Sequence, residues 1–374
     1  MFDVLIIGAG PSGSNLARLL AKNSPTYWVG IIEKRALNQS SETTNRIKSC
    51  GGLISEAAQI ELAIQGLTLP SSIYVSPQFF KVHIIDMDNH LENDYPRHYL
   101  NIDRSAFDRY LFHLIPDTVE KMDMTLVTEI TQIPHGYRVQ VVSPSGIKVY
   151  ETKNLVAADG ANSFTRKQLI KTYSGADYFS IQATFESKQH FSHYLGVFDQ
   201  SITDYYGWAI QKDNRIQIGC AFPRSEKAAH LKFQLLVNKL SAYEGINTSQ
   251  MLNLEGAHIE RFNALEFAPV KLKGFYLMGE AAGAISPSSA EGISFALKTS
   301  RQLAAAFQLN HSNAIRKQYL RLIQPTKISL VAKRLKLPAM FVPCIRKYVI
   351  KSGLTSLPKL SPIGNYPKKR HKLI

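Results

Sequence analysis

The chain has 374 residues, with 44 Lys or Arg against 29 Asp or Glu, and a formal net charge of +15. A hydrophobic content of 45% is enough for a sizeable core and excludes an intrinsically disordered protein. The cysteines Cys50, Cys220 and Cys344 are too few and too scattered for a disulfide framework or a Cys-x-x-Cys metal site, which favours a reducing compartment. No apolar run reaches the ~18–20 residues of a membrane span, and no signal-peptide pattern precedes the first strand, so we expect a cytoplasmic protein.

The first forty residues predict a dinucleotide-binding unit. The apolar run Phe2–Ile7 has the length of a buried strand, and a glycine-rich turn and a segment with helical spacing follow at once. Glycines in this pattern suit a tight turn, close approach to a pyrophosphate and close packing of helix on strand. A second apolar strand ends at Glu33, where a carboxylate can accept the hydroxyls of an adenosine ribose. We assign the following residues to the cofactor site: Gly8, Gly10, Pro11, Ser12, Gly13, Glu33 and Lys34.

Two later segments also place an acid and small residues at the end of a short strand. They are 155–163, with Asp159-Gly160, and 274–283, with Gly279-Glu280. Small residues let a strand end approach a ribityl chain, and the following helix N-terminus can face the pyrophosphate or flavin ring. The expected cofactor contacts from these segments are Asp159, Gly160, Gly279, Glu280, Gly283, Gly292 and Ile293.

The order of these motifs resembles the p-hydroxybenzoate-hydroxylase-like FAD fold, although that family usually has Gly-Asp where this chain has Gly279-Glu280. The segment Cys50-Gly51-Gly52 resembles one that follows the second strand of geranylgeranyl-reductase-like flavoproteins, and 101–108 resembles their arginine-bearing helix start. At nearly full length the chain resembles the CbrA-type oxidoreductases of this group. The resemblance implies FAD as cofactor, with Cys50, Gly51 and Arg104 near the flavin. Asp103 itself suits the N-cap of that helix.

Residues 178–222 predict four strands, with a hairpin turn at Asp213-Asn214. Tyr206 and Trp208 lie two apart, so they share one face of a strand and form either a substrate wall or an ordinary aromatic core. The segment 205–210 resembles the Tyr-x-Trp-x-Phe-Pro signature of the reductase substrate domain, but Ile210-Gln211 replaces Phe-Pro and weakens the case for the same prenyl substrate.

Cys50 is the candidate catalytic group, because a thiol beside a flavin could be a redox partner or a proton donor; it could also be a small apolar contact. The histidines show no spacing typical of a metal site, and no Gly-x-Ser-x-Gly elbow indicates a hydrolase.

The positive charge is concentrated at one end of the chain. Residues 292–374 hold 17 Lys or Arg and no acid, which leaves 27 basic and 29 acidic residues, a charge of −2, in residues 1–291. Cationic and apolar residues interleave over 314–337 and suit an anionic membrane surface, which would place the protein at the inner face of the cell membrane. A helical cap with its lysines in water is an equal alternative, and nucleic acid is a third that no recognition motif favours. We expect the final stretch Pro367–Lys372 to be mobile.

Together these features predict an α/β fold: a Rossmann-like parallel sheet that binds FAD, an inserted antiparallel-sheet substrate domain and a helical C-terminus. The expected division is FAD-binding parts at 1–70, 101–172 and 269–310, substrate-domain strands at 71–100, the antiparallel substrate domain at 173–268, and a basic helical segment at 311–374. The expected activity is FAD-dependent reduction of C=C bonds in a prenyl or lipid-like substrate, with electrons from a donor such as NAD(P)H. The alternatives are an FAD-dependent monooxygenase acting on an aromatic or lipid, and a flavin-bearing protein that only binds a membrane surface.

Overall fold

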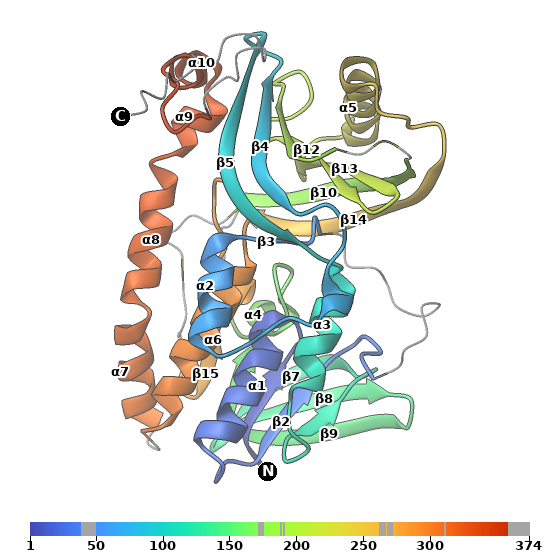
Figure 1. Cartoon of the computed structure of the whole chain (residues 1–374). Helices are drawn as coiled ribbons and strands as arrows, with labels where there is room; N and C mark the ends of the chain where they lie inside the picture. Colours follow the sequence, from blue (N-terminus) through green and yellow to red (C-terminus); the bar gives the residue numbers. More distant parts are fainter. Residues whose placement is uncertain are drawn as a thin grey trace, which may run out of the picture.

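The computed structural model describes residues 1–38, 50–170, 176–187, 189, 191–261, 267, 272–309 and 312–357. Two sheets with helices packed around them form two lobes, and a column of C-terminal helices runs along both (Figure 1). The expected α/β class, with a parallel sheet, a second sheet and a helical C-terminus, is confirmed. The stretch Pro367–Lys372 lies outside the described residues.

The first sheet has seven strands within the described residues, in the order β6-β2-β1-β9-β8-β7, and β15 also pairs with β9. The strands are β1 (Phe2–Ile7), β2 (Val29–Ile32), β6 (Glu120–Met122), β7 (Leu126–Ile133), β8 (Gly136–Ser143), β9 (Gly146–Ala157) and β15 (Phe275–Leu277). The pairs β6–β2, β2–β1, β1–β9 and β9–β15 are parallel, while β7, β8 and β9 form an antiparallel meander. Because Ile7 is in register with both Ile32 and Ala157, and Ala157 with Leu277, the carboxyl ends of four strands meet at one edge.

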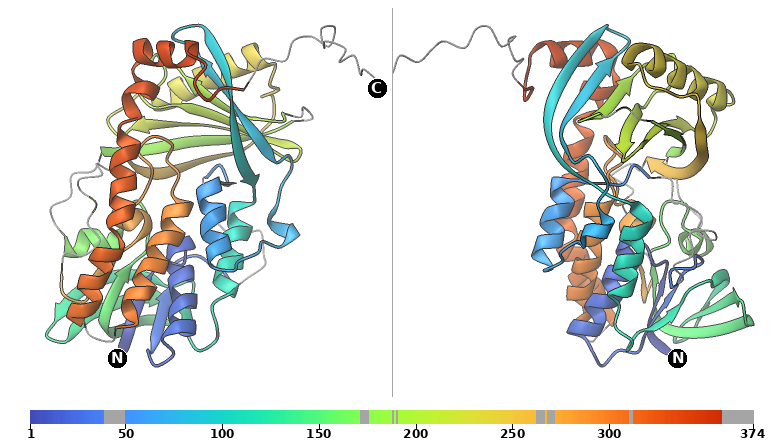
Figure 2. Two further views of the ribbon diagram at one scale, coloured as in Figure 1. Left: turned by 60° about the vertical axis from the view of Figure 1, so that its left-hand side comes forward. Right: turned by 45° about the vertical axis from the view of Figure 1, so that its right-hand side comes forward.

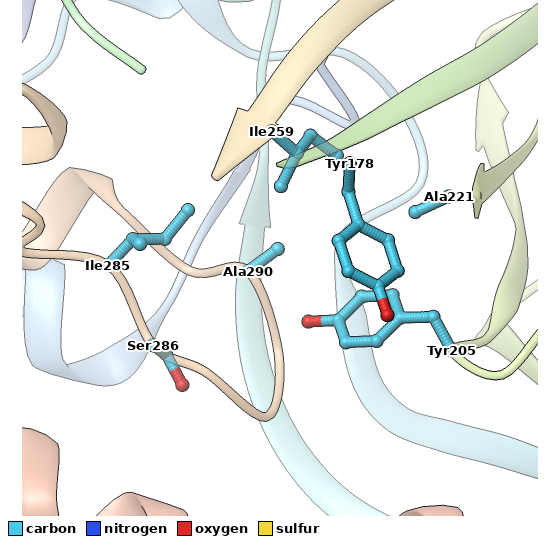
Figure 3. Close-up of a pocket in the computed structure, with 7 residues that line it drawn as sticks. All are labelled: Tyr178, Tyr205, Ala221, Ile259, Ile285, Ser286 and Ala290. Carbon is cyan, nitrogen blue, oxygen red and sulfur yellow. The ribbon is translucent and has the colours of Figure 1, made fainter. Parts of the chain in front are cut away.

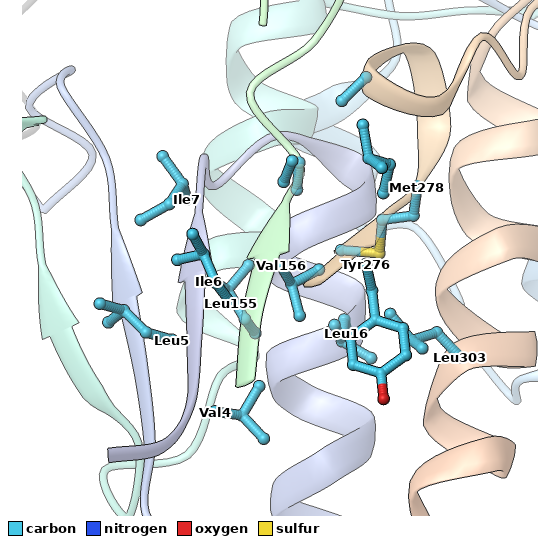
Figure 4. Packing of buried hydrophobic residues seen from close by; sticks show 14 of the residues in the cluster. Val4, Leu5, Ile6, Ile7, Leu16, Leu155, Val156, Tyr276, Met278 and Leu303 are labelled. Carbon is cyan, nitrogen blue, oxygen red and sulfur yellow. The ribbon is translucent and has the colours of Figure 1, made fainter. Parts of the chain in front are cut away.

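The core of this lobe lies between the sheet and the helices α1 (Pro11–Asn23) and α6 (Ile293–Phe307), which pack against each other. The side chains of Val4 and Ile6 on β1 and of Leu16 on α1 are fully buried (Figure 4). A run that is apolar at consecutive positions is typical of a strand covered on both faces, and here this arrangement is observed. Helix α3 (Arg104–His113) also packs against α1, and α4 (Phe164–Leu169) lies near β7.

The second sheet has eight described strands in the order β14-β10-β13-β12-β11-β4-β5-β3. They are β3 (Leu53–Ile54), β4 (Phe79–Asp86), β5 (Leu91–Asn101), β10 (Ala176–Glu186), β11 (Tyr194–Phe198), β12 (Gly207–Lys212), β13 (Arg215–Pro223) and β14 (Met251–Arg261). The pair β4–β11 is parallel, which departs from the antiparallel sheet that the sequence predicts. A parallel pair needs a long connection, and the chain between β4 and β11 supplies it by building much of the first lobe.

The two faces of the second sheet have different surroundings. Helix α5 (Ala229–Glu244) covers one face, where Ile218 and Cys220 on β13 and Leu236 on α5 belong to one buried apolar cluster. Because side chains alternate along a strand, Tyr206, Trp208, Ile210 and Lys212 point to the other face. Figure 1 shows that the face opposite α5 is turned toward the first lobe. The surface between the lobes is therefore lined by this row, of which the sequence singles out Tyr206 and Trp208.

The remaining helices are α2 (Glu56–Ile64), η1 (Ser71–Ile73), η3 (Gly279–Ala282), α7 (Ser312–Leu322), α8 (Gln324–Arg334), α9 (Leu337–Phe341) and α10 (Pro343–Lys351). Pro325, Pro338 and Pro343 each occupy the first turn of a helix, where the missing N–H group costs no hydrogen bond. These prolines divide the helical pattern into α7–α8, which form a nearly continuous column, and the shorter α9 and α10 beside the second sheet (Figure 2). Within the described ranges, no helix combines the length and apolar character needed to cross a bilayer.

Candidate functional site

The glycine-rich turn after β1 leaves almost no room for side chains on its inner side. Gly8 has a positive φ of 102°, and a Cβ atom on it would lie 2.6 Å from the carbonyl oxygen of Ala158. A Cβ atom on Gly13 would lie 1.8 Å from the carbonyl oxygen of Gly8. These glycines therefore allow the start of α1 to pack directly on β1 and on the end of β9, as a dinucleotide-binding turn requires.

The outer side of the same turn is open. A Cβ atom on Gly10 would meet nothing within 4 Å, and Gly10 is the N-cap of α1, with extended backbone and no side-chain cap. Pro11 occupies the first turn of the helix, and no acidic residue lies in that turn. The positive end of the helix dipole thus faces open space, and this arrangement fits a pyrophosphate. Ser12 is buried, and its Oγ would lie 2.2 Å from a Cβ atom on Gly279. The segment 274–283 therefore packs directly on the glycine-rich turn.

Glu33 lies at the end of β2, beside this turn, and is buried. Its Oε2 accepts a hydrogen bond of 2.8 Å from the N–H of Ala9, and Arg35 donates to its carboxylate from the backbone N–H, Nε and Nη2. Burial alone would raise the pKa of Glu33, but the charge of Arg35 and these hydrogen bonds outweigh it and lower the pKa. The carboxylate is therefore ionised and aimed at the turn, as a ribose acceptor must be. Lys34, also expected at the site, has an exposed side chain.

A chain of charged side chains leads from Glu33 to Cys50. Arg35 donates from Nη1 to Asp108 at 2.9 Å, and Arg104 donates to the other carboxylate oxygen of Asp108 from Nε, also at 2.9 Å. The Nη1 of Arg104 lies 3.3 Å from the Sγ of Cys50. Sequence reasoning missed Arg35 and Asp108, although Asp108 lies four residues after Arg104, the spacing of an ion pair on a helix. As predicted, Asp103 caps this helix, because its side chain accepts from the N–H of Ala106.

The other two predicted segments also lie at the carboxyl edge of the first sheet. A Cβ atom on Gly8 would lie 2.9 Å from the Cα of Asp159, and Gly160 has a positive φ of 80° with open space around its missing side chain. The carboxylate of Asp159 accepts hydrogen bonds from Ser163 and Thr165 at the start of α4. It therefore holds this turn together, and its expected contact with a ribityl chain stays a prediction.

In the segment 274–283, Gly283 has a positive φ of 83° and caps η3. The carboxylate of Glu280 lies against Gly292, where a Cβ atom would come within 2.7 Å of its Oε1. Gly292 is the N-cap of α6 and the buried Ile293 is the first residue of that helix, while the carboxylate of Glu291 accepts a hydrogen bond of 3.0 Å from the N–H of Ser294 in the first turn. The N-terminus of α1, which has no side-chain cap, and the N-terminus of α6 therefore lie close to the same edge of the sheet.

The row of side chains that runs from Tyr206 along β12 to Lys212 faces this edge from the second sheet. The ring of Trp208 lies flat over Gly219, its partner in register on β13, where a Cβ atom would come within 2.3 Å of the ring. Its Nε1 donates to Gln182 at 3.3 Å, and the hydroxyl of Tyr206 donates to the carbonyl of Ser289 at 2.9 Å. The two aromatic side chains contact each other edge to face, with ring centroids 5.9 Å apart.

The same row continues to Ile210 and Lys212, which contact the segment containing Cys50. A Cβ atom on Gly51 would lie 2.6 Å from the Cδ1 of Ile210. The Nζ of Lys212 donates to the carbonyls of Gly52 and Ile102 at 3.1 and 2.9 Å, and to the side-chain oxygen of Asn101 at 2.5 Å. Lys212 thus joins the second sheet to the segments that precede β3 and α3.

Lys212 is the third residue that sequence reasoning missed at this site. Burial disfavours its ammonium form and outweighs the charges of Cys50, Asp103 and Asp213, so its pKa is lowered to about 7. The period-two alternation from Tyr206 could have indicated this position, but a lysine at the end of a strand is ordinarily solvated. Only the structure shows the three oxygens that surround it.

A small apolar pocket lies beside this row. Figure 3 shows the rings of Tyr178 and Tyr205 on one side and Ile285 and Ala290, from the loop between η3 and α6, on the other. The hydroxyl of Tyr178 is engaged with Asp204 at 2.6 Å. Within the described residues, no cluster of three or more His, Cys, Asp or Glu forms a potential metal site.

No family model matches the chain. Among curated proteins, the protein CbrA of Shigella flexneri serotype 5b (strain 8401) is 35% identical over 372 residues, which cover 98% of this chain and 97% of that protein. The chain belongs to the CbrA family. At 17% identity, the fold of this CbrA family member resembles that of a geranylgeranyl bacteriochlorophyll reductase-like protein from Thermoplasma acidophilum, with a TM-score of 0.77 over 93% of this chain and 90% of that one. It also resembles PqsL, a probable FAD-dependent monooxygenase from Pseudomonas aeruginosa, at 18% identity and a TM-score of 0.68, over 94% and 99% of the chains.

Proposed function

We propose that this CbrA family member is an FAD-dependent oxidoreductase that reduces C=C bonds in a prenyl or other lipid-like substrate. The observation that carries the proposal is the apolar pocket beside the Trp208 row, which faces the same sheet edge as the glycine-rich turn. Structures with this fold include a reductase-like protein and a probable FAD-dependent monooxygenase, and both support a flavoenzyme.

The residues at the sheet edge fit FAD. The open space at Gly10, before an uncapped helix, would receive the pyrophosphate, and the buried carboxylate of Glu33 would accept the ribose hydroxyls. Gly160 and the N-terminus of α6 at Gly292 would border the ribityl chain and the ring system. Reduced FAD supplies hydride chemistry when bound, and the protein supplies orientation and a dry pocket.

The side chains of the β12 row would position an apolar substrate against this edge. The pocket is lined by Ala221, Ile259, Ile285 and Ala290 together with two tyrosine rings, so it would exclude water from the reacting double bond. Saturating a C=C bond takes a hydride at one carbon and a proton at the other. Lys212, with its pKa of about 7, can hold that proton near neutral pH, and Cys50 lies in the segment it contacts. Electrons would come from a donor such as NAD(P)H.

The test is a single-turnover reaction under nitrogen. Protein reconstituted with FAD is reduced with dithionite and mixed with geranylgeraniol, and the product is analysed by mass spectrometry. We expect a product that gains two hydrogen atoms per reduced bond while the absorbance of oxidised flavin returns. A product that forms only in air and contains oxygen would instead establish a monooxygenase. A protein that takes up no FAD would contradict the cofactor itself.

A further inference from the structure

The C-terminal helices are held on the body in a fixed orientation. Arg346 on α10 is buried, with a side chain only 4% exposed, and its Nη2 lies 2.7 Å from Asp86 and 2.6 Å from Asp88 at the end of β4. Phe341 on α9 stacks on Tyr205, with ring centroids 5.0 Å apart. The inner side of this segment is therefore packed and ion-paired, so its outer side is a defined surface and not the face of a loose tail.

The outer side of the column carries an apolar stripe. Ile328, Val331 and Leu335 follow one another at helical spacing, and their side chains are 66%, 39% and 82% exposed. The opposite side of α8 is buried at Thr326 and Leu330. Tyr348 on α10 is 75% exposed. Figure 2 shows in its left-hand view that the column forms the surface of the molecule along both lobes.

Positive charge surrounds this stripe. Residues 312–357 contain ten Lys or Arg and no Asp or Glu. Lys317 and Arg321 are exposed at helical spacing before Ile328, and Lys336, Lys347 and Lys351 are exposed on the following helices. Arg346 is an exception, because it faces inward to its two aspartates. An exposed apolar stripe on a basic, acid-free segment matches an anionic bilayer, where the apolar side chains enter the acyl boundary and the cations meet the headgroups.

We propose that the outer face of α7, α8 and α10 docks on an anionic phospholipid bilayer. The docked orientation places α9 close to the membrane, and α9 forms part of the wall beside the pocket through the contact of Phe341 with Tyr205. A lipid-like substrate would then leave the bilayer near the pocket. The proposed docking depends only on the exposed face of these helices. It is independent of the reaction that the protein catalyses.

The experiment is co-sedimentation of the full chain with two kinds of vesicle, phosphatidylcholine alone and phosphatidylcholine mixed with phosphatidylglycerol. We expect binding to the mixed vesicles, and less binding as salt is raised. Ile328→Ser with Leu335→Ser should weaken binding at least about tenfold, since the apolar contribution is lost. Lys317→Gln and Arg321→Gln should each weaken it about fivefold. The matched control is Leu231→Ser with Leu235→Ser, which removes two exposed leucines from α5 on the second sheet.

Point variants are preferable to deleting residues 340–374, because the deletion would also remove Arg346 and leave Asp86 buried without its partner. Thermal unfolding and circular dichroism verify that each variant is folded. Equal binding by the wild type and the Ile328/Leu335 variant would overturn the proposal, as would equal loss in the α5 control. A wild type that ignores both vesicles but forms a dimer, which the Ile328/Leu335 variant does not form, would assign the face to a second copy of the chain instead.

Discussion

The two sides of the candidate site are built by different means. At the carboxyl edge of the first sheet, backbone makes the surface, and Gly8 and Gly13 are in contact with other main-chain atoms. On the second sheet, the surface is a row of side chains from Tyr206 to Lys212, each held by a partner far away in sequence. The first side is therefore sensitive to added volume, and the second to the chemical character of its side chains.

The largest effect is expected where a methyl group would meet backbone. Gly13→Ala would place Cβ 1.8 Å from the carbonyl oxygen of Gly8, so α1 must move off β1. We expect a loss of about 3 kcal/mol or more in the free energy of unfolding, measured by urea denaturation of the protein without FAD. Gly10→Ala is the control, because nothing lies within 4 Å of that Cβ. It should leave the stability unchanged and weaken FAD binding about tenfold. Equal stability losses in both variants would remove the distinction between the two glycines.

The next effect is expected at Glu33, whose side chain lies at the carboxyl edge of the first sheet. Glu33→Gln keeps the volume but removes the negative charge that Arg35 and the N–H of Ala9 contact. We expect about ten- to hundredfold weaker FAD binding, the range for hydrogen bonds to a charged group, measured by fluorescence titration. Lys34→Ala is the comparison, since its side chain is exposed. If Lys34→Ala weakened FAD binding more than Glu33→Gln, the ribose role would pass to the lysine.

The same contrast explains what could be predicted from the sequence. The glycine-rich turn, Glu33 and the cap at Asp103 depend on neighbours within a short stretch of chain, so spacing alone indicates them. The face of Tyr206 and Trp208 follows from alternation along a strand. Arg35 could not be distinguished from Lys34, because which of two adjacent cations turns inward depends on Asp108, which is 73 residues further on.

The C-terminal segment shows the same limit of sequence reasoning. Its charge was evident, but the alternatives of a packed cap and a membrane surface could not be separated, because both use amphipathic helices. The structure shows an inner face that is packed as a cap, with Arg346 buried against Asp86 and Asp88. Leu335 and its neighbours on the outer face are left exposed. A sequence pattern identifies two faces on a helix, whereas the partner of each face comes from elements distant in the chain.

A smaller effect is expected where volume is added on the second sheet. Gly219→Ala would bring Cβ within 2.3 Å of the ring of Trp208, which can tilt because it is a side chain and not backbone. We expect a loss of about 1–3 kcal/mol in the free energy of unfolding and a shift of tryptophan fluorescence. Gly256→Ala on β14 is the matched control, because its Cβ would have only an ordinary contact at 3.5 Å. An unshifted fluorescence spectrum in Gly219→Ala would show that Trp208 does not depend on this glycine.

The last effect is a pH dependence and concerns the chemical character of Lys212. Its pKa is about 7 in the folded chain and about 10.5 in the unfolded chain, so between these values the unfolded chain holds a proton that the folded chain has released. The free energy of unfolding should therefore rise with pH in this window, by at most about 1.4 kcal/mol per pH unit.

Lys212→Met removes this group, so the stability of the wild type relative to the variant should increase from pH 7 to pH 9. Lys336→Met, at an exposed position, controls for the loss of a positive charge. Urea denaturation at each pH measures the difference. A difference that does not change with pH would mean that the oxygens of Gly52, Asn101 and Ile102 hold Lys212 as an ammonium group throughout, and the lysine would then position the Cys50 segment without supplying a proton.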